Sequence, residues 1–339
     1  MKRIMIFAAA LILCMALHAA AAEVSPYAVL NVDRNEKSGE VKLTLTVTGV
    51  KPGGTTITKT APDGVAKWDK FDKWYEELFG ITYLSDDYGR LWKQLHQRGA
   101  SFAKEFFDAE MLEAVKGAKL LVVVDAVRPF PADVFRFGDK WLFEIVPIVH
   151  STKAGPKDVG DDYKYKTALV LDCQGPKDRE GAEAPGVDAV IGKLPGVPHK
   201  MILSLTPEVT VKNLEENSAD VLHIATHAEP DEFFPGRVKP GIKVEKLAKL
   251  KLRYHTILST GCLTGNPLFA GAALHDDVRF VIASMYVTSG KDGIKVADVF
   301  YKELFSGKTP FESFYEVKKR ITGPKPDFPD VLRYVIYVR

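Results

Sequence analysis

The sequence predicts an α/β protein built on a mostly parallel, doubly wound sheet flanked by helices, with a small N-terminal β hairpin unit. Apolar runs without polar alternation, such as LLVVV at 120–124 and ALVL at 168–171, are typical of strands buried on both faces of a parallel sheet. From residue 166 onward, such runs alternate with helical patterns. Strand and helix in alternation predict a parallel sheet with short, right-handed connections.

The chain begins with the pattern of a secretory signal. Lys2 and Arg3 precede an apolar run at 4–17 that is too short to span a membrane comfortably. Ala20–Ala22 supply the small residues of a cleavage site. We therefore expect a signal peptide at 1–22, a periplasmic or secreted product, and no stable membrane insertion after cleavage.

The charge balance bears on the class of partner. The chain has 46 basic and 44 acidic residues, and the signal holds two of the basic ones, so the expected mature chain has 44 minus 44, a formal charge of zero. A neutral chain argues against a nucleic-acid or anionic-membrane role. After the signal only Cys173 and Cys262 remain. One disulfide is the alternative reading, but an intervening strand would hold the cysteines too far apart.

Residues 23–64 are expected to form the β-rich unit, and residues 65–339 the main domain. Tyr27–Val32 and Val41–Val47 flank the turn-like NEKSG, so they predict a hairpin. Thr55–Thr60 is an expected edge strand. Amphipathic patterns then predict helices at Lys67–Phe79, Asp87–Phe107 and Asp108–Ala118.

The main domain follows in order. Leu120–Val124 is an expected buried strand, and Trp141–Val149 is an expected strand with Pro147 near its end. Further strands are predicted at Lys166–Asp172, Lys200–Leu205, Arg279–Met285 and Val331–Val338. Further helices are predicted at Val187–Leu194 and Thr210–Asn217, within Leu263–Leu274, and at Lys295–Phe305 and Pro310–Ile321.

The centre of the chain is a strand–helix–strand unit. Asp220–Thr226 leads into His227, Val244–Leu252 is the expected crossover helix, and Tyr254–Thr260 leads toward Cys262. The two strands should be parallel neighbours, and ligands of open α/β sheets bind at their carboxyl ends. A thiol within reach of an imidazole is a nucleophile–base pair.

Two other histidines are expected to have no part in catalysis. His223 is expected in the core, because VLHIATH reads as a strand. A zinc pair of His223 and His227 would need a helix, since four strand residues span about 13 Å. His255 is expected at the opposite edge of the sheet. We predict no metal and no organic cofactor.

These motifs resemble those of a known family. Asp220–Ala228 (DVLHIATHA) resembles the HxATHG signature of the CHAT family, caspase-like cysteine peptidases of the caspase and separase clan. Leu258–Gly265 (LSTGCLTG) resembles its SACxTG signature. The resemblance covers about four-fifths of the chain, from Trp68 to Arg339. It includes Leu120–Phe135, Val281–Gly290 and Ala297–Ile321.

The resemblance implies a caspase-like fold and an endopeptidase that acts on a protein or peptide substrate. It implies that His227 is the general base, that Cys262 is the nucleophile, and that the N–H groups of Ala228 and Cys262 form the oxyanion hole. In relatives that cleave after arginine or lysine, an acid near Asp172 lines the first specificity pocket. A loop-capping role for Asp172 is the alternative reading, and the rival pocket acids are Glu229, Asp231 and Asp292.

Two other functions remain open from the sequence. A catalytically silent binding scaffold of the same fold is the main alternative, and Ala228, where the family usually has glycine, favours it. A small-molecule amidase is the second. The order of histidine before cysteine argues against an amidotransferase-type glutaminase.

Overall fold

The structure is a computed structural model that describes residues 27–48, 54–82, 88–125, 128–153, 163–175, 183–275, 277–286, 288, 290–320 and 332–339. Of residues 78–82 and 88–92, it describes only the backbone. The expected signal peptide at 1–22 lies outside the described residues and stays a prediction.

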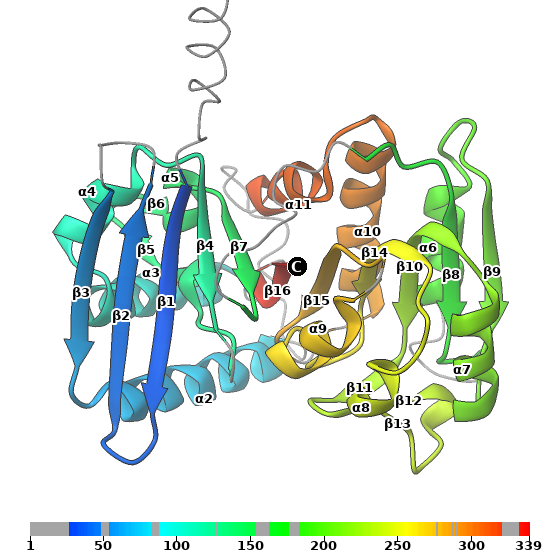
Figure 1. Ribbon diagram of the computed structural model, residues 1–339, viewed down its shortest axis with the longest axis horizontal. Helices are drawn as coiled ribbons and strands as arrows, with labels where there is room; N and C mark the ends of the chain where they lie inside the picture. Colours follow the sequence, from blue (N-terminus) through cyan, green and yellow to red (C-terminus); the bar gives the residue numbers. More distant parts are fainter. Residues whose placement is uncertain are drawn as a thin grey trace, which may run out of the picture.

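The molecule is organised on one eleven-stranded sheet (Figure 1). From edge to edge the order is β3-β2-β1-β4-β7-β16-β15-β14-β10-β8-β9. Most neighbouring pairs in the main domain are parallel, which confirms the predicted fold class. In that order the bounds are Thr55–Ala61, Glu40–Val47, Tyr27–Asn35, Leu120–Val124, Ile148–Ser151, Tyr334–Val338, Phe280–Ser284, Tyr254–Ser259, Ala219–Ala225, Ala168–Asp172 and His199–Leu203.

The helices flank this sheet in groups. α6 packs on α10, which also packs on α11, whereas α8 packs beside α9. Helix α11 begins with Pro310 after Thr309, whose hydroxyl accepts from Glu312 N–H while the Glu312 carboxylate accepts from Thr309 N–H. The helices are α2 (Gly64–Thr82), α3 (Tyr88–Phe106), α4 (Ala109–Val115), α5 (Leu142–Ile145), α6 (Glu183–Ile191), α7 (Pro207–Glu216), α8 (Val244–Leu247), α9 (Pro267–Ala273), α10 (Gly290–Phe305) and α11 (Pro310–Lys319).

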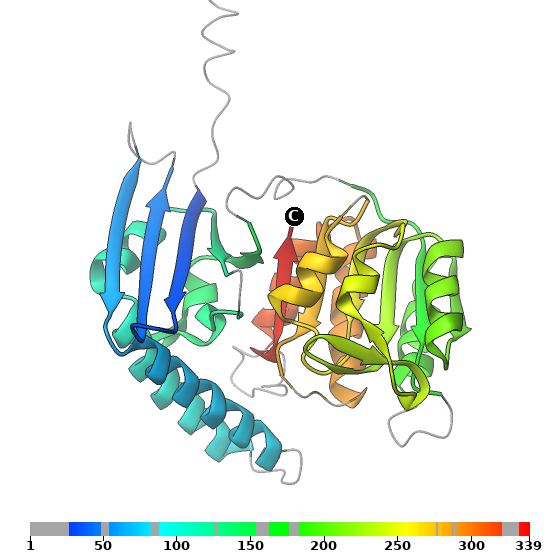
Figure 2. The same cartoon turned by 60° about the horizontal axis from the view of Figure 1, so that its bottom comes forward.

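The N-terminal hairpin belongs to the same sheet as the rest of the chain. β1 pairs antiparallel with β2 and parallel with β4, where Leu30 lies opposite Val123. The three predicted strands are therefore confirmed, and they extend the main sheet at one edge. Figure 2 shows these strands beside the start of the long helix α2. The predicted boundary between 23–64 and 65–339 stays a prediction.

The predicted strand at Trp141–Val149 is wrong. The chain forms the end of β6 (Lys140–Trp141), the helical turn α5, and then the shorter strand β7. The local cause is a capping interaction, in which Trp141 N–H donates to the Glu144 carboxylate over 2.7 Å. Pro147 follows the turn and cannot continue a helix, so the chain leaves it as an extended strand.

The crossover between β10 and β14 is also different from the prediction. The expected helix Val244–Leu252 shrinks to α8, and a three-stranded sheet precedes it. That sheet consists of β11 (His227–Glu229), β12 (Glu232–Phe234) and β13 (Ile242–Lys243). His227 therefore begins a short strand instead of lying in an open loop.

The core explains why the site-bearing strands are held firmly. All five residues of β8 and β15 are buried, as are the last five of β10. Burying one large aliphatic or aromatic side chain stabilises a fold by about 1.5–3 kcal/mol. The loops at the ends of these strands therefore start from fixed positions.

Within the described part of the chain, no helix combines the length and the apolar character needed to cross a bilayer.

Candidate active site

The two predicted reactive side chains follow neighbouring parallel strands. In the β10–β14 register, Ile224 lies opposite Ser259, and Thr260 N–H donates to the Ile224 carbonyl over 3.1 Å. His227 comes two residues after the end of β10, and Cys262 three residues after the end of β14. The predicted pairing of these two strands is confirmed.

The loops that carry His227 and Cys262 pack directly against each other. A methyl group added at Gly261 would lie 2.9 Å from Thr226 Cγ2 and 3.3 Å from the Ala228 methyl group. Thr226 and Ala228 flank His227, and Gly261 precedes Cys262. A glycine at position 261 is therefore what allows the two loops to approach so closely.

Cys262 lies half-buried in a tight turn. Its thiol is 3.8 Å from the Thr288 carbonyl oxygen, and the cysteine is not in a disulfide. The next residue, Leu263, has a left-handed backbone with φ 61°, and its N–H donates to the Tyr286 carbonyl over 3.3 Å. Such a conformation is uncommon for a branched side chain and is found at functional turns. The turn presents a thiol that solvent can reach.

His227 is half-buried and contacts a cation. Its Nε2 accepts a hydrogen bond from the Arg237 Nε–H group over 3.2 Å. A neutral imidazole has one ring nitrogen that accepts a hydrogen bond and one that carries the proton. Because Nε2 accepts from Arg237, the ring proton is on Nδ1. In this arrangement the imidazole can take a proton on Nε2 only after Arg237 moves away. Arg237 is exposed, so nothing in its burial holds it there.

His223 has the environment of a core residue, as the sequence predicts. It is fully buried, with Nδ1 3.0 Å from the Tyr301 hydroxyl and Nε2 3.3 Å from the Thr260 hydroxyl. Burial lowers the pKa of His223 to about 3, so it is neutral at ordinary pH. His255 is near the start of β14, where its Nδ1 is 2.5 Å from the Tyr165 hydroxyl.

Asp172 ends β8, the strand on the other side of β10. Its side chain is buried, and Oδ1 accepts from the N–H groups of Gln174 and Gly175, each over 3.0 Å. These are the contacts of the loop-capping alternative. Cys173 is buried and free, and β10 separates its strand from that of Cys262, as expected from the sequence.

A buried carboxylate that the sequence analysis missed lies near Thr260, which follows the end of β14. Glu183, at the start of α6, is buried and accepts from Gln174 Nε2 over 3.1 Å. A methyl group added at Gly293 would lie 2.2 Å from Glu183 Oε1 and 3.1 Å from Thr260 Cγ2. Glu183 follows a glycine- and charge-rich segment, so no periodicity pointed to it.

The other acids differ in accessibility. Asp292 is in the first turn of α10, with its side chain 13 % exposed and 4.0 Å from Lys295 Nζ. Glu229 and Asp231 are exposed. Within the described ranges, no group of three or more His, Cys, Asp and Glu residues is arranged to hold a metal ion.

Comparisons with known proteins bear on the fold. No protein-family model and no curated protein matches the chain. Two crystal structures of the Saccharomyces cerevisiae separase–securin complex are similar to it, with TM-scores of 0.53 and 0.55 at 10% and 9% identity. Each match covers 92% of this chain but only 30% of the other. At such low identity the similarity shows the fold alone, and that fold is the caspase-like fold of separase.

Proposed function

We propose that this chain is an exported cysteine endopeptidase of the CHAT type, with Cys262 as nucleophile and His227 as general base. The observation that carries the proposal is the direct packing of the two loops that bear these residues, at the ends of adjacent parallel strands. A thiol and an imidazole on loops that pack together are the two groups that acyl transfer by a cysteine nucleophile requires.

The proposed reaction starts with transfer of the Cys262 proton to His227. The thiolate then attacks a peptide carbonyl carbon, while the N–H groups of Cys262 and Ala228 stabilise the oxyanion. Collapse of the tetrahedral intermediate breaks the C–N bond, and His227 returns the proton to the leaving amine. Water, activated by His227, hydrolyses the thioester and frees the enzyme. The substrate binds as an extended strand, and no metal or cofactor takes part.

The hydrogen bond from Arg237 to His227 would define an inactive resting state of the proposed enzyme. While its guanidinium donates to His227 Nε2, that nitrogen is not available to the thiol. Arg237 belongs to the short 3-10 turn η2 (Pro235–Arg237), in the connection between β12 and β13. Substrate binding along the cleft that displaces this side chain would release the base.

Cleavage after arginine or lysine is the specificity that we propose for the primary pocket. Three acids are candidates for this pocket: Asp172 at the end of β8, Glu183 in the first turn of α6, and Asp292 in the first turn of α10. Because the Asp172 carboxylate already caps its own loop, Glu183 and Asp292 are the stronger candidates for the acid that binds the basic side chain. Cleavage sites without lysine or arginine preference would contradict this proposal.

A catalytically silent scaffold is the second candidate function. The contact between Arg237 and His227 favours it, because it occupies the base. Separase, a known protein of similar fold, has been crystallised in complex with securin. A protein-binding surface is therefore compatible with the fold, and the chain's own partner in either case would be a polypeptide.

The decisive experiment compares the purified protein with its Cys262→Ala variant under mild reductant. Each is incubated with a denatured proteome, and new peptide termini are identified by mass spectrometry. We expect termini that the Cys262→Ala variant does not produce. Cys173→Ala is the matched control, because it removes the buried free cysteine and leaves Cys262 in place.

Identical profiles from a folded Cys262→Ala variant and the unchanged protein would exclude the peptidase and favour the scaffold.

A further inference from the structure

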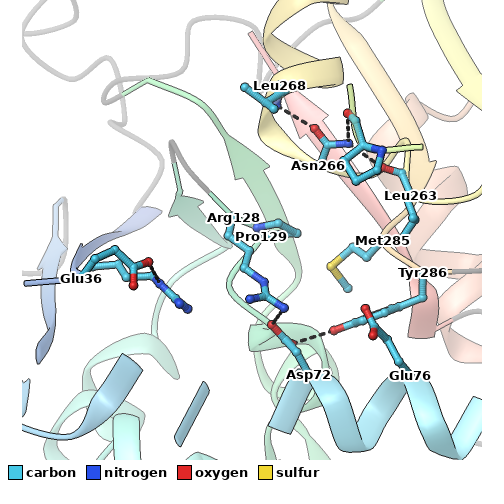
Figure 3. A pocket seen from close by; sticks show the side chains of 12 residues that line it. Glu36, Asp72, Glu76, Arg128, Pro129, Leu263, Asn266, Leu268, Met285 and Tyr286 are labelled. Carbon is cyan, nitrogen blue, oxygen red and sulfur yellow. Dashed lines mark hydrogen bonds and ion pairs between the residues drawn. The ribbon is translucent and has the colours of Figure 1, made fainter. Parts of the chain in front are cut away.

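A cavity of about 350 Å³ lies next to the candidate active site (Figure 3). One wall comes from the N-terminal half of the chain, from β1, α2 and the segment Arg128–Pro129 after β4. The opposite wall comes from the loops after β10, β14 and β15, through Pro230, Leu263 and Met285. Its size is within the range of ligand sites in proteins, about 300–1,000 Å³.

The charged wall of the cavity is predominantly acidic. Arg128 lies 2.6 Å from Asp72 Oδ2 and 2.9 Å from Asp69 Oδ1. Arg34 lies 2.8 Å from the same oxygen of Asp69 and 2.5 Å from Glu36 Oε1. Each guanidinium is thus held between two carboxylates. An anionic ligand would have to compete with these carboxylates, which argues against a phosphate or carboxylate in the cavity.

One further carboxylate makes the net charge of the cavity lining negative. Glu76, on α2, lines the cavity, is exposed, and forms no ion pair within the part of the chain that the structure describes. With it the lining of the cavity comprises three carboxylates, Glu36, Asp72 and Glu76, and two guanidiniums, Arg34 and Arg128. Three minus two leaves a net charge of −1 when all are ionised, and Asp69, which does not line the cavity, contacts both guanidiniums. The cavity therefore favours a cation.

The other wall is apolar. Its apolar side chains are Leu263, Leu268, Met285 and Pro230. Leu268 is 53% exposed, although it is a large apolar side chain. An apolar wall facing an acidic one suits a ligand with an aliphatic stem and a positively charged end.

The cavity is connected to the reactive cysteine by the chain itself. Leu263, in its wall, directly follows Cys262 and donates its N–H to the carbonyl of Tyr286, which also lines the cavity. A polypeptide that passes Cys262 toward the N-terminal half therefore reaches this cavity next.

We propose that this cavity is an accessory substrate subsite that binds a lysine or arginine side chain of the polypeptide substrate. It is separate from the proposed primary pocket and binds a second basic residue. The stem packs on Leu263 and Leu268, and the cationic end lies between Asp72 and Glu76. This inference rests on the proposed peptidase function for the source of the side chain, but binding can be measured without cleavage.

The titration of Asp72 adds a pH signature. Burial raises the pKa of Asp72 to about 7, against the lowering effects of Arg128 and of the hydrogen bond from Tyr286, while Glu76 and Asp69 raise it further. A bound cation favours the ionised carboxylate. Affinity for a basic side chain should therefore increase as pH rises through 7, and the Asp72→Asn variant should lose this dependence.

The test uses full-length protein carrying Cys262→Ala, so that no cleavage occurs. The probe is a fluorescein-labelled decapeptide of alanine, serine and glycine with two arginines. It is compared with versions in which one arginine, the other, or both are replaced by citrulline, which keeps the shape but not the charge. Binding is followed by fluorescence anisotropy. Glu76→Lys is compared with Glu77→Lys, its neighbour on α2 that is exposed but does not line the cavity.

We expect Glu76→Lys to weaken binding about fivefold or more, and Glu77→Lys to change it by less than about twofold. A benzophenone placed beside the accessory arginine should cross-link to Met285 or to α2. Equal effects of the two variants, or equal binding when both arginines are citrulline, would overturn the subsite. Arginine-dependent binding at the cavity with no cleavage by the unchanged protein would retain the subsite and reject the peptidase.

Discussion

Two regions of this molecule place ionisable side chains at the carboxyl ends of parallel strands, and they use them in opposite ways. In the N-terminal half, Asp125 follows β4 and His150 is the third residue of β7. In the C-terminal half, His227 and Cys262 follow β10 and β14. The first group is sealed inside the protein, whereas the second is half-buried.

The sealed group is a buried, linear series of ionic contacts. His150 lies 2.9 Å from Asp125 and 2.9 Å from Asp133, and Lys318 of α11 lies 2.7 Å from Asp133. Burial alone would lower the pKa of His150, but the two aspartates raise it to about 9. Although burial opposes its ionisation, Lys318 and His150 lower the pKa of Asp133 to about 2. Burial raises the pKa of Asp125.

The comparison teaches that a strand-end position does not by itself make a reactive site. His150 has partners at both ring nitrogens and no access to solvent, so it can only stabilise the fold. His227 is half-buried, accepts a hydrogen bond from an exposed arginine, and lies on a loop that packs against the loop of Cys262. Burial and access to solvent therefore distinguish the structural group from the candidate site.

The largest expected effect is on catalysis. His227→Ala should lower the rate of peptide cleavage by about 10²–10⁴, because the thiol loses its general base. The same variant should change the free energy of unfolding by less than about 1 kcal/mol, since the side chain is half-buried. Initial cleavage rates test the effect on catalysis, and urea unfolding tests the effect on stability. Cleavage that persists unchanged in His227→Ala would place the base elsewhere.

The sealed group should show the reverse pattern. Lys318→Met removes the cation beside Asp133 and should destabilise the fold by about 3–5 kcal/mol in urea unfolding. Lys319→Met is the matched control, because it makes the same change on the next residue, where the side chain is 46% exposed. It should cost less than about 1 kcal/mol. Equal losses for the two variants would remove the contrast between the regions.

The pH dependence of stability should follow the sealed group. The pKa of His150 is raised above its unfolded value, so its contribution is fully present below pH 6.5 and is lost as pH rises through about 9. The pKa of Asp133 is lowered, so its contribution is present above pH 3.8 and is lost as pH falls through about 2. Each contributes on the order of 2–3 kcal/mol.

Urea unfolding from pH 5 to 10 measures the alkaline loss, with His150→Gln as the reference. If the unchanged protein kept its full stability above pH 9, the ionic role of His150 would be rejected.

The smallest expected effect concerns Arg237. Arg237→Ala removes the donor to His227 Nε2 and should raise the cleavage rate about two- to fivefold, because one exposed hydrogen bond no longer has to be broken. Arg253→Ala is a control that removes an exposed guanidinium elsewhere; it contacts the Glu215 carbonyl instead. A lower rate in Arg237→Ala would make Arg237 a positioning residue for the base.

The sequence predicted the parts of the fold that depend on long-range burial. The apolar runs that become β4, β8, β10 and β14 are confirmed, because strands covered on both faces tolerate few polar residues. The pairing of β10 with β14 followed from their connection. The segments that failed, at 141–149 and 244–252, are decided by local contacts such as the Glu144 cap, which apolar periodicity does not encode.

The sequence predicted the part of the candidate site that the two short motifs contain. The strand ends before His227 and Cys262 were correctly placed next to each other. Arg237 and Glu183 were missed, since each approaches the site from a segment without a periodic pattern. The cavity was also missed, because it forms between segments as distant as Asp72 and Tyr286. Only tertiary structure brings such residues together.

The most direct test of the central claim is the pH dependence of Cys262 alkylation by iodoacetamide, read residue by residue by mass spectrometry. An unassisted thiol reacts with a midpoint near its ordinary pKa of about 8.5. Because Arg237 occupies His227 Nε2 in the resting protein, the comparison starts from the Arg237→Ala variant. We predict a clearly lower midpoint for Cys262 in Arg237→Ala, a return to about 8.5 when His227→Ala is added, and no reaction at buried Cys173, where burial raises the thiol pKa to about 12. The same midpoint for Cys262 in both proteins would contradict the proposed pairing of the thiol with His227.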